Sequence, residues 1–155
     1  MSTDFYVAVP IDNWPNAEQV QQCAAARGYP IVIERFPELG QAEAVEDGAM
    51  VRLADGAQAY LEGSLFTAKF EPEEVADIND RLAASSSFSI DQNDAIMSIY
   101  VRSIVEMRAA SYVIASLIVC FNGLGFEPQG DKGGKEDFAE MLLAGVQQLD
   151  GMDDR

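Results

Sequence analysis

The sequence contains no histidine among its 155 residues and only two cysteines, Cys23 and Cys120. The lack of histidine excludes Ser-His-Asp and Cys-His nucleophile activation, imidazole acid–base catalysis and histidine metal ligation. The cysteines lack the close spacing of zinc sites, and each lies among apolar neighbours in a predicted helix. We therefore expect two buried free thiols, with a single bridge as the alternative. These absences predict a non-enzyme without cofactor or metal.

Basic residues are also scarce. Ten Lys and Arg stand against 26 Asp and Glu, which gives a formal net charge of −16. Nucleic-acid backbones and anionic membrane surfaces both need a positive footprint, so neither is an expected partner. The excess favours a basic protein as partner, or it serves solubility alone.

Long hydrophobic runs are missing as well. The most apolar stretch, Ala109–Phe121, contains two serines and is shorter than the roughly 20 residues that span a membrane, so it predicts a buried core helix. The first residues, Met1–Asp4, are acidic where a secretory signal would be basic. We expect a cytoplasmic protein.

Apolar periodicity and turn residues predict one α+β domain over residues 1–155. Asp55-Gly56 between alternating segments predicts a hairpin, Asn13 is a candidate cap for the first helix, and residues 150–155 are expected to fray. We expect a two-layer sandwich whose mixed or antiparallel sheet carries helices mainly on one face, with one long buried helix near 103–121. Strands are predicted at 5–11, 29–36, 50–53, 58–61, 65–70, 95–101 and 126–128, and helices at 15–27, 71–84, 103–121 and 136–149.

Two segments resemble ligand-binding motifs but lack the required residues at the positions that each motif demands. Asp91–Asp94 begins like a calcium loop, but Ile96 and Arg102 occupy the positions of the required Gly and Glu. The glycine-rich segment 129–135 lacks the order of a phosphate loop and places Asp131 where a lysine belongs, so it predicts a flexible connection. A divalent-metal carboxylate enzyme remains an alternative, because such sites need only Asp and Glu.

Acidic residues concentrate between Glu34 and Asp80, with twelve acidic side chains against three basic ones. If the loops at 37–47 and 54–56 and the start of helix 71–84 share one face, that face would steer a cationic protein. Trp14, in a turn, is either an interface anchor or a hydrophobic cover over the first helix. The predicted partner-binding residues are Trp14, Glu38, Glu43, Glu46, Asp47, Asp55 and Glu62.

Two patterns carry a family resemblance. The first is an apolar strand, a glycine and a short strand ending in Phe-Glu, here 59–63 and 69–71. The second is a strand, a glutamate and a long helix followed by Gly125-Phe126-Glu127-Pro128-Gln129. Together they resemble immunity-protein-like families that accompany bacterial polymorphic toxin systems. The resemblance implies an inhibitor that covers a cognate toxin, and it assigns no catalytic residue. The alternative is a homo-oligomeric structural protein with helix 103–121 partly at a subunit interface.

Overall fold

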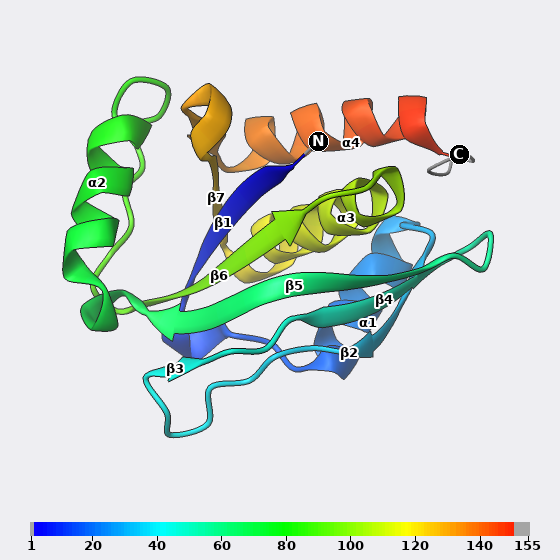
Figure 1. Cartoon of the computed structure of the whole chain (residues 1–155), viewed down its shortest axis with the longest axis horizontal. Coiled ribbons are helices and arrows are strands. Elements are labelled where there is room, and N and C mark those ends of the chain that lie inside the picture. Colours follow the sequence, from blue (N-terminus) through cyan, green and yellow to red (C-terminus); the bar gives the residue numbers. More distant parts are fainter. Residues whose placement is uncertain (1, 151–155) are drawn as a thin grey trace.

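A computed structural model describes residues 2–150 of the chain. Within them, the strands hydrogen-bond in the order β2-β4-β5-β6-β1-β7-β8, every pair antiparallel, and β3 pairs with β5 beside that path (Figure 1). The strands are β1 (Thr3–Pro10), β2 (Ile31–Arg35), β3 (Ala44–Val45), β4 (Ala49–Leu53), β5 (Gln58–Thr67), β6 (Asp94–Val101), β7 (Leu124–Glu127) and β8 (Lys132–Gly134). The helices are α1 (Ala17–Arg27), α2 (Pro72–Leu82), α3 (Ile104–Phe121) and α4 (Glu136–Leu149), with 3-10 turns η1 (Ile11–Asn13), η2 (Ala68–Phe70) and η3 (Pro128–Gly130).

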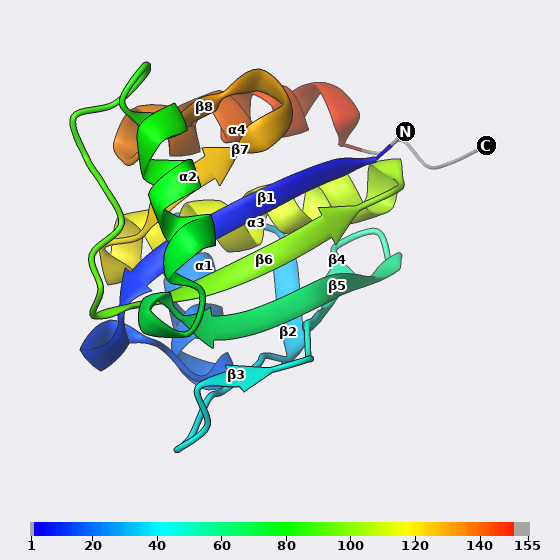
Figure 2. The same cartoon turned by 60° about the vertical axis from the view of Figure 1, so that its left-hand side comes forward.

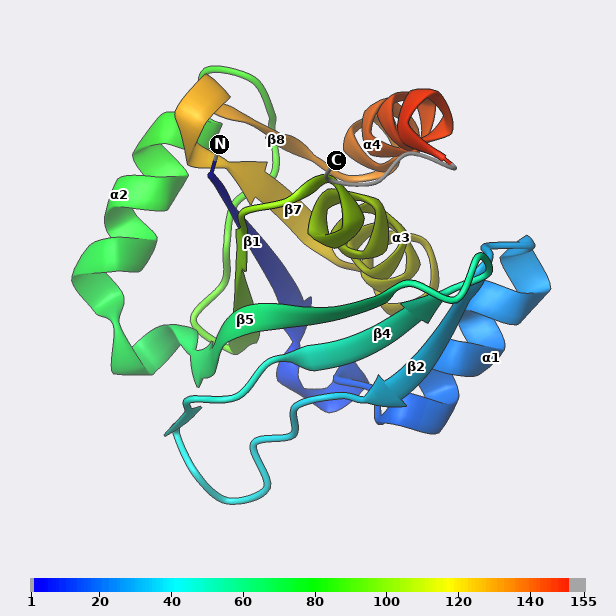
Figure 3. The same ribbon diagram turned by 45° about the vertical axis from the view of Figure 1, so that its right-hand side comes forward.

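The sheet separates two helical coverings of unequal size. Helices α1, α3 and α4 lie on one side, called the inner face, and α2 lies on the other, the outer face (Figure 3). Successive strand residues point to opposite faces. Val7 and Met97 are therefore fully buried in the inner core, whereas Ile96 and Phe126 pack against Leu82 of α2. The predicted α+β sandwich, with an antiparallel sheet and helices mainly on one face, is confirmed.

Helix α3 is the predicted long buried helix. Ser103 caps its first turn by accepting a hydrogen bond from the Glu106 amide, and Asn122 ends it in the left-handed conformation. Residues 108–118 are all buried. The hydroxyls of Ser111 and Ser116 donate to carbonyls four residues earlier, at 2.8 Å each, so neither is left without a partner in the core.

Helix α3 is also long and apolar enough to cross a membrane by length and composition alone, but 61% of that stretch is buried within the fold. This burial is that of a core helix. The enclosed middle of α3 packs within its own fold, and the alternative of a subunit interface that includes part of this helix stays a prediction.

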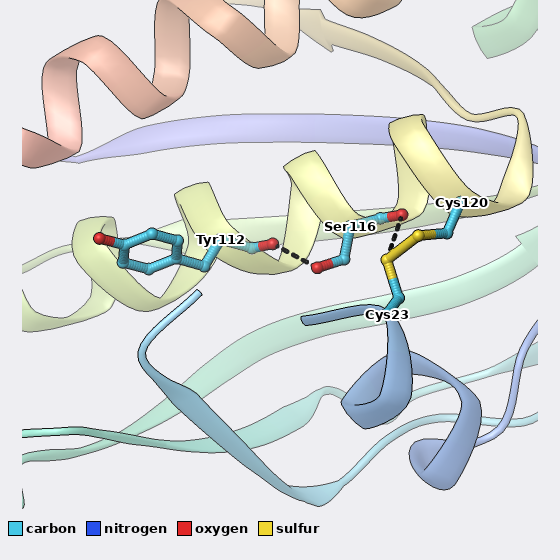
Figure 4. The surroundings of a disulfide bond; sticks show 4 residues. All are labelled: Cys23, Tyr112, Ser116 and Cys120. Carbon is cyan, nitrogen blue, oxygen red and sulfur yellow. Dashed lines mark hydrogen bonds between the residues drawn. A yellow bond between two sulfur atoms is a disulfide. The ribbon is translucent and has the colours of Figure 1, made fainter. Parts of the chain in front are cut away.

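The expectation of two free thiols is wrong. Cys23 of α1 and Cys120 at the end of α3 form a disulfide, with Cα atoms 6.3 Å apart across a sequence separation of 97 residues (Figure 4). The first helix packs across the last turn of α3, a contact that no local pattern predicts. Disulfides persist mainly in oxidising compartments, so the cysteines no longer support the cytoplasmic prediction.

Several local predictions need correction. Asn16, not Asn13, caps α1, and it forms a capping box with Gln19. The predicted strands 58–61 and 65–70 are not separate, because β5 runs unbroken through Gly63. A Cβ atom at Gly63 would lie 1.8 Å from the Ser98 carbonyl oxygen, so only glycine allows β6 so close. The expected flexible connection at 129–135 contains η3 and β8.

The predicted frayed tail lies outside the described residues except for Asp150. That residue is ordered by its contacts: its carboxylate accepts a hydrogen bond from the Tyr112 hydroxyl at 3.0 Å and lies 3.7 Å from the buried Arg108 guanidinium. Burial, reinforced by the Asp150 carboxylate, raises the pKa of Tyr112 to about 12. The end of α4 is thereby tied to α3.

Candidate functional site

On the outer face, the end of β5 leads through η2 into the start of α2 (Figure 2). A small cavity is lined by residues of these elements. Its floor is formed by outward-pointing residues of three neighbouring strands, and one wall is formed by η2 and the first turn of α2. We call this cavity the acidic hollow. It is lined by Tyr6, Ala44, Glu46, Ser64, Phe66, Phe70, Glu71, Glu74 and Ser98.

The chemistry of the acidic hollow suits a cation. Three acidic residues, Glu46, Glu71 and Glu74, line the cavity together with aromatic rings. Burial and the neighbouring Glu74 carboxylate raise the pKa of the Tyr6 hydroxyl, so this phenol stays neutral and can donate a hydrogen bond. On the floor, the Ser64 and Ser98 hydroxyls lie 2.9 Å apart because β5 and β6 pair these residues directly.

The volume of the hollow limits its occupant. The cavity measures about 140 Å³, or roughly five times the share of one water molecule in the liquid. Drug-sized ligands occupy cavities of about 300 Å³ or more. The hollow therefore accommodates the end of one long side chain.

The acidic residues of the hollow form no salt bridge within the part of the chain that the structure describes. Among the described residues, no Lys or Arg forms a salt bridge with Glu46, Glu71 or Glu74. By contrast, Glu34 pairs with Arg52 at 2.7 Å. The charges of these three residues are therefore not offset by any described ion pair, unlike that of Glu34.

Next to the hollow, the outer face is uncovered along β2, β4 and the start of β5. We call this area the open sheet face. Each of its two aromatic rings makes a cation–π contact with an arginine. The Arg35 guanidinium lies 5.5 Å from the centre of the Tyr60 ring, and the Arg102 guanidinium lies 5.0 Å from the centre of the Tyr100 ring. The open sheet face comprises Val32, Glu34, Met50, Arg52, Gln58, Tyr60, Glu62 and Tyr100.

The structure gathers some of the predicted partner-binding residues on this side. Glu46 lines the hollow, and the exposed Glu43 lies beside β3. Asp47 is nearby but paired, because its carboxylate accepts a hydrogen bond from Arg35 at 3.1 Å. Glu62 lies on the open sheet face, in an ion pair with Arg102.

Asp55 lies far from the hollow, at the β4–β5 hairpin. The hollow adjoins the other end of β5, and a ten-residue strand spans roughly 30 Å. The Asp55 carboxylate accepts a hydrogen bond from the Ala57 amide and pairs with Arg108 at 2.9 Å, and both interactions lower its pKa. The hairpin acid thus pairs with α3 and lies a strand's length from the hollow, so the condition that all three acidic segments share one face is not met for the hairpin.

Trp14 and Glu38 lie together in a separate hollow of about 310 Å³ beside η1. The indole N–H of Trp14 donates to the Pro37 carbonyl at 3.0 Å, and its ring stacks on Phe36 with centres 5.5 Å apart. These contacts make Trp14 a cover over the core, one of its two predicted roles.

Sequence reasoning did not select most of the residues that line the hollow. Glu71 and Glu74 were counted in the acidic region, but the local pattern assigned them only to a helix start. Tyr6 and Ser98 lie in strands that pair across more than 90 residues, so their proximity depends on sheet order and register. An outward-pointing serine in an otherwise apolar strand was the only available signal.

Comparison with known proteins gives no further assignment. Within the described part of the chain, no three His, Cys, Asp or Glu side chains are grouped to hold a metal ion. No protein-family model matches the chain, and no curated protein or solved structure matches it either. The resemblance to immunity-protein-like families therefore stays a prediction.

Proposed function

We propose that this chain is a non-catalytic binding module that holds a basic protein against its outer sheet face. A Lys or Arg side chain of the partner enters the acidic hollow. The observation that carries the proposal is that Glu46, Glu71 and Glu74, none in a salt bridge among the described residues, line a cavity the size of the end of one long side chain. An inhibitor that covers a cognate toxin, as the immunity-protein resemblance implies, is one form of this function.

The open sheet face supplies the contact area around the hollow. Tyr and Arg dominate binding hot spots, since they contribute large contact area and directional hydrogen bonds. Tyr60 and Tyr100 are each more than a third exposed, and Val32 is about half exposed. A partner seated there would bury these groups around the charged hollow.

The edge of the sheet is less suited to a partner than its face. On β2, the carbonyl of Ile31 accepts a hydrogen bond from the Gln21 side chain at 3.1 Å, and the amide of Ile33 donates to the same side chain at 2.6 Å. The side-chain amide of Gln21, a residue of α1, thus takes the place of a neighbouring strand. Strand addition, which needs free backbone groups at the edge, is disfavoured here.

The test compares two variants of equal net charge. Glu46→Gln/Glu74→Gln removes two charges from the hollow, and Glu18→Gln/Glu140→Gln removes two exposed charges from α1 and α4. Each protein is used as bait in a lysate of the source organism at low and moderate salt. The retained proteins are identified, and their affinities for wild-type and variant bait are then measured with purified components.

We expect one basic protein to be retained by wild type and by the α1/α4 variant, and lost from the hollow variant and with rising salt. Loss of two charge-assisted contacts should weaken binding by about tenfold or more. Equal weakening by both variants would show that only net charge matters. Binding that ignores salt, or the absence of any basic partner, would also contradict the proposal.

A further inference from the structure

A second cavity, of about 290 Å³, lies at the opposite end of β1 from the N-terminus and is separate from the acidic hollow. It forms where β1 ends, β6 begins and α3 passes into β7. Its apolar wall includes Phe88 and Leu124. Its polar lining includes Asp91, Asp94, Asn122 and Lys135.

The carboxylates of this cavity come from the segment that resembles the start of a calcium loop. In the structure it is a tight turn in which Asp94 accepts a hydrogen bond from the Asp91 amide at 2.9 Å, and Asp91 accepts one from the Asn93 amide at 2.8 Å. Asp94 is only 9% exposed although it lines the cavity. Burial raises its pKa, while the charge of Lys135 opposes that rise.

A cationic group lies in the same cavity. The ammonium of Lys135 donates to the Asn122 side-chain oxygen at 2.7 Å and lies 4.7 Å from the centre of the Phe88 ring. This hydrogen bond orients the Asn122 amide so that its NH₂ group remains a donor beside the ammonium. Lys135 forms no salt bridge with Asp94 or Asp91 among the described residues.

A buried carboxylate and an ammonium thus share one cavity without contacting each other. A buried charge is costly unless it is paired, and the cavity leaves room for a molecule that pairs both. A ligand with one cationic and one anionic end offsets the cost of the buried Asp94 carboxylate and also pairs with the partly exposed Lys135 ammonium. A simple anion or cation would satisfy one pole and meet repulsion at the other.

We propose that this cavity binds a small zwitterion, a free α-amino acid, with its ammonium at Asp91 and Asp94 and its carboxylate at Lys135 and Asn122. The volume holds roughly ten molecules of liquid water, which matches a ligand of about ten non-hydrogen atoms. Phe88 and Leu124 then face the ligand's side chain. This inference is independent of the proposed function, because it uses none of the residues of the hollow.

The experiment is an NMR titration of the isotope-labelled full chain with each of the twenty common α-amino acids, added singly. Acetate and methylammonium serve as half-ligands. Two variants remove one pole each, Asp94→Asn and Lys135→Met, and Lys132→Met is the matched control because Lys132 is exposed and does not line the cavity. Thermal unfolding checks that each variant is folded.

We expect at least one amino acid to shift the amide signals of residues 88–94 and 122–135, and both half-ligands to bind more weakly. Each pole variant should weaken binding by about tenfold or more, and Lys132→Met should leave it unchanged. If Asp94→Asn does not fold, Lys135→Met decides the question, because Lys135 lies outside the hydrophobic core. No shifts with any amino acid, shifts elsewhere, or full affinity in a folded pole variant would overturn the proposal.

Discussion

The two faces of the sheet are made by the same strands and differ in nearly every physical respect. The inner face is covered by three helices and forms a dry core around α3. The outer face is covered by α2 over β1, β6, β7, β8 and the end of β5, whereas β2, β4 and the start of β5 remain exposed on this face. Strand β6 is therefore covered by helices on both faces, whereas the start of β5 is covered on the inner face only.

This difference in covering explains the different patterns of the strands. The first four residues of β6, Asp94–Met97, are all buried, whereas β5 alternates between exposed and buried residues from Gln58 to Glu62. A strand buried on both faces is expected to be apolar throughout, and a strand buried on one face to alternate. Polar and aromatic side chains therefore lie on the part of the outer face that no helix covers.

The largest expected effect is in the inner core. Leu117→Ala removes a fully buried side chain from α3 and should lower the free energy of unfolding by about 2–5 kcal/mol through lost transfer energy and the cavity left behind. Tyr100→Ser on the open sheet face, where the ring is 37% exposed, should change it by about 1 kcal/mol or less. Denaturant titration of both variants measures the contrast. Equal costs would contradict the distinction between the two faces.

The next effect concerns the covalent link within the inner layer. Cys120→Ser opens the disulfide that closes a 97-residue separation, and the loss should be about 2–4 kcal/mol, chiefly through greater freedom of the unfolded chain. Addition of a reductant to wild type should reproduce the loss and leave the variant unaffected. Detection of two free thiols in the purified, air-oxidised protein would show that the bond does not form.

The smallest effect tests the single helix of the outer layer. The Asn79 side chain accepts a hydrogen bond from the Ile90 amide at 2.7 Å and donates to the Ile90 carbonyl at 3.1 Å. Asn79→Ala should cost about 1–2 kcal/mol, since two partly buried hydrogen bonds are lost. The neighbouring Asp80→Ala is the control, because Asp80 is exposed. Hydrogen exchange should show faster opening of 72–94 with the inner layer unchanged; faster exchange throughout would mean that the layers unfold together.

Much of the fold could be predicted from local patterns. Helix α4 begins and ends where its periodicity indicates, and the Asp55-Gly56 hairpin joins β4 and β5 as expected. These elements depend on the spacing of apolar and turn residues that are close together in the sequence, so the sequence alone predicts them. The cap of α1 was misplaced by three residues because both Asn13 and Asn16 satisfy the same local rule.

The candidate site could be predicted only in part. The acidic character of the segment around Glu46 was visible in composition, but its partners in the hollow, Tyr6 and Ser98, come from strands on other parts of the chain. Asp55 carries the same charge as Glu46 and belongs to the same acidic region, yet the length of β5 separates them. Composition counts charges without assigning them to a face.

The amino-acid sequence by itself determined the strongly negative charge, the absence of imidazole chemistry, the boundaries of α4 and the burial of α3. Only the tertiary structure decided that Cys23 meets Cys120, that Arg108 is paired with Asp55, and that two serines face each other on the floor of the hollow. The physical reason is distance along the chain. Local structure follows from the period of neighbouring residues, whereas contacts across tens of residues depend on strand order and helix packing, which the whole chain settles together.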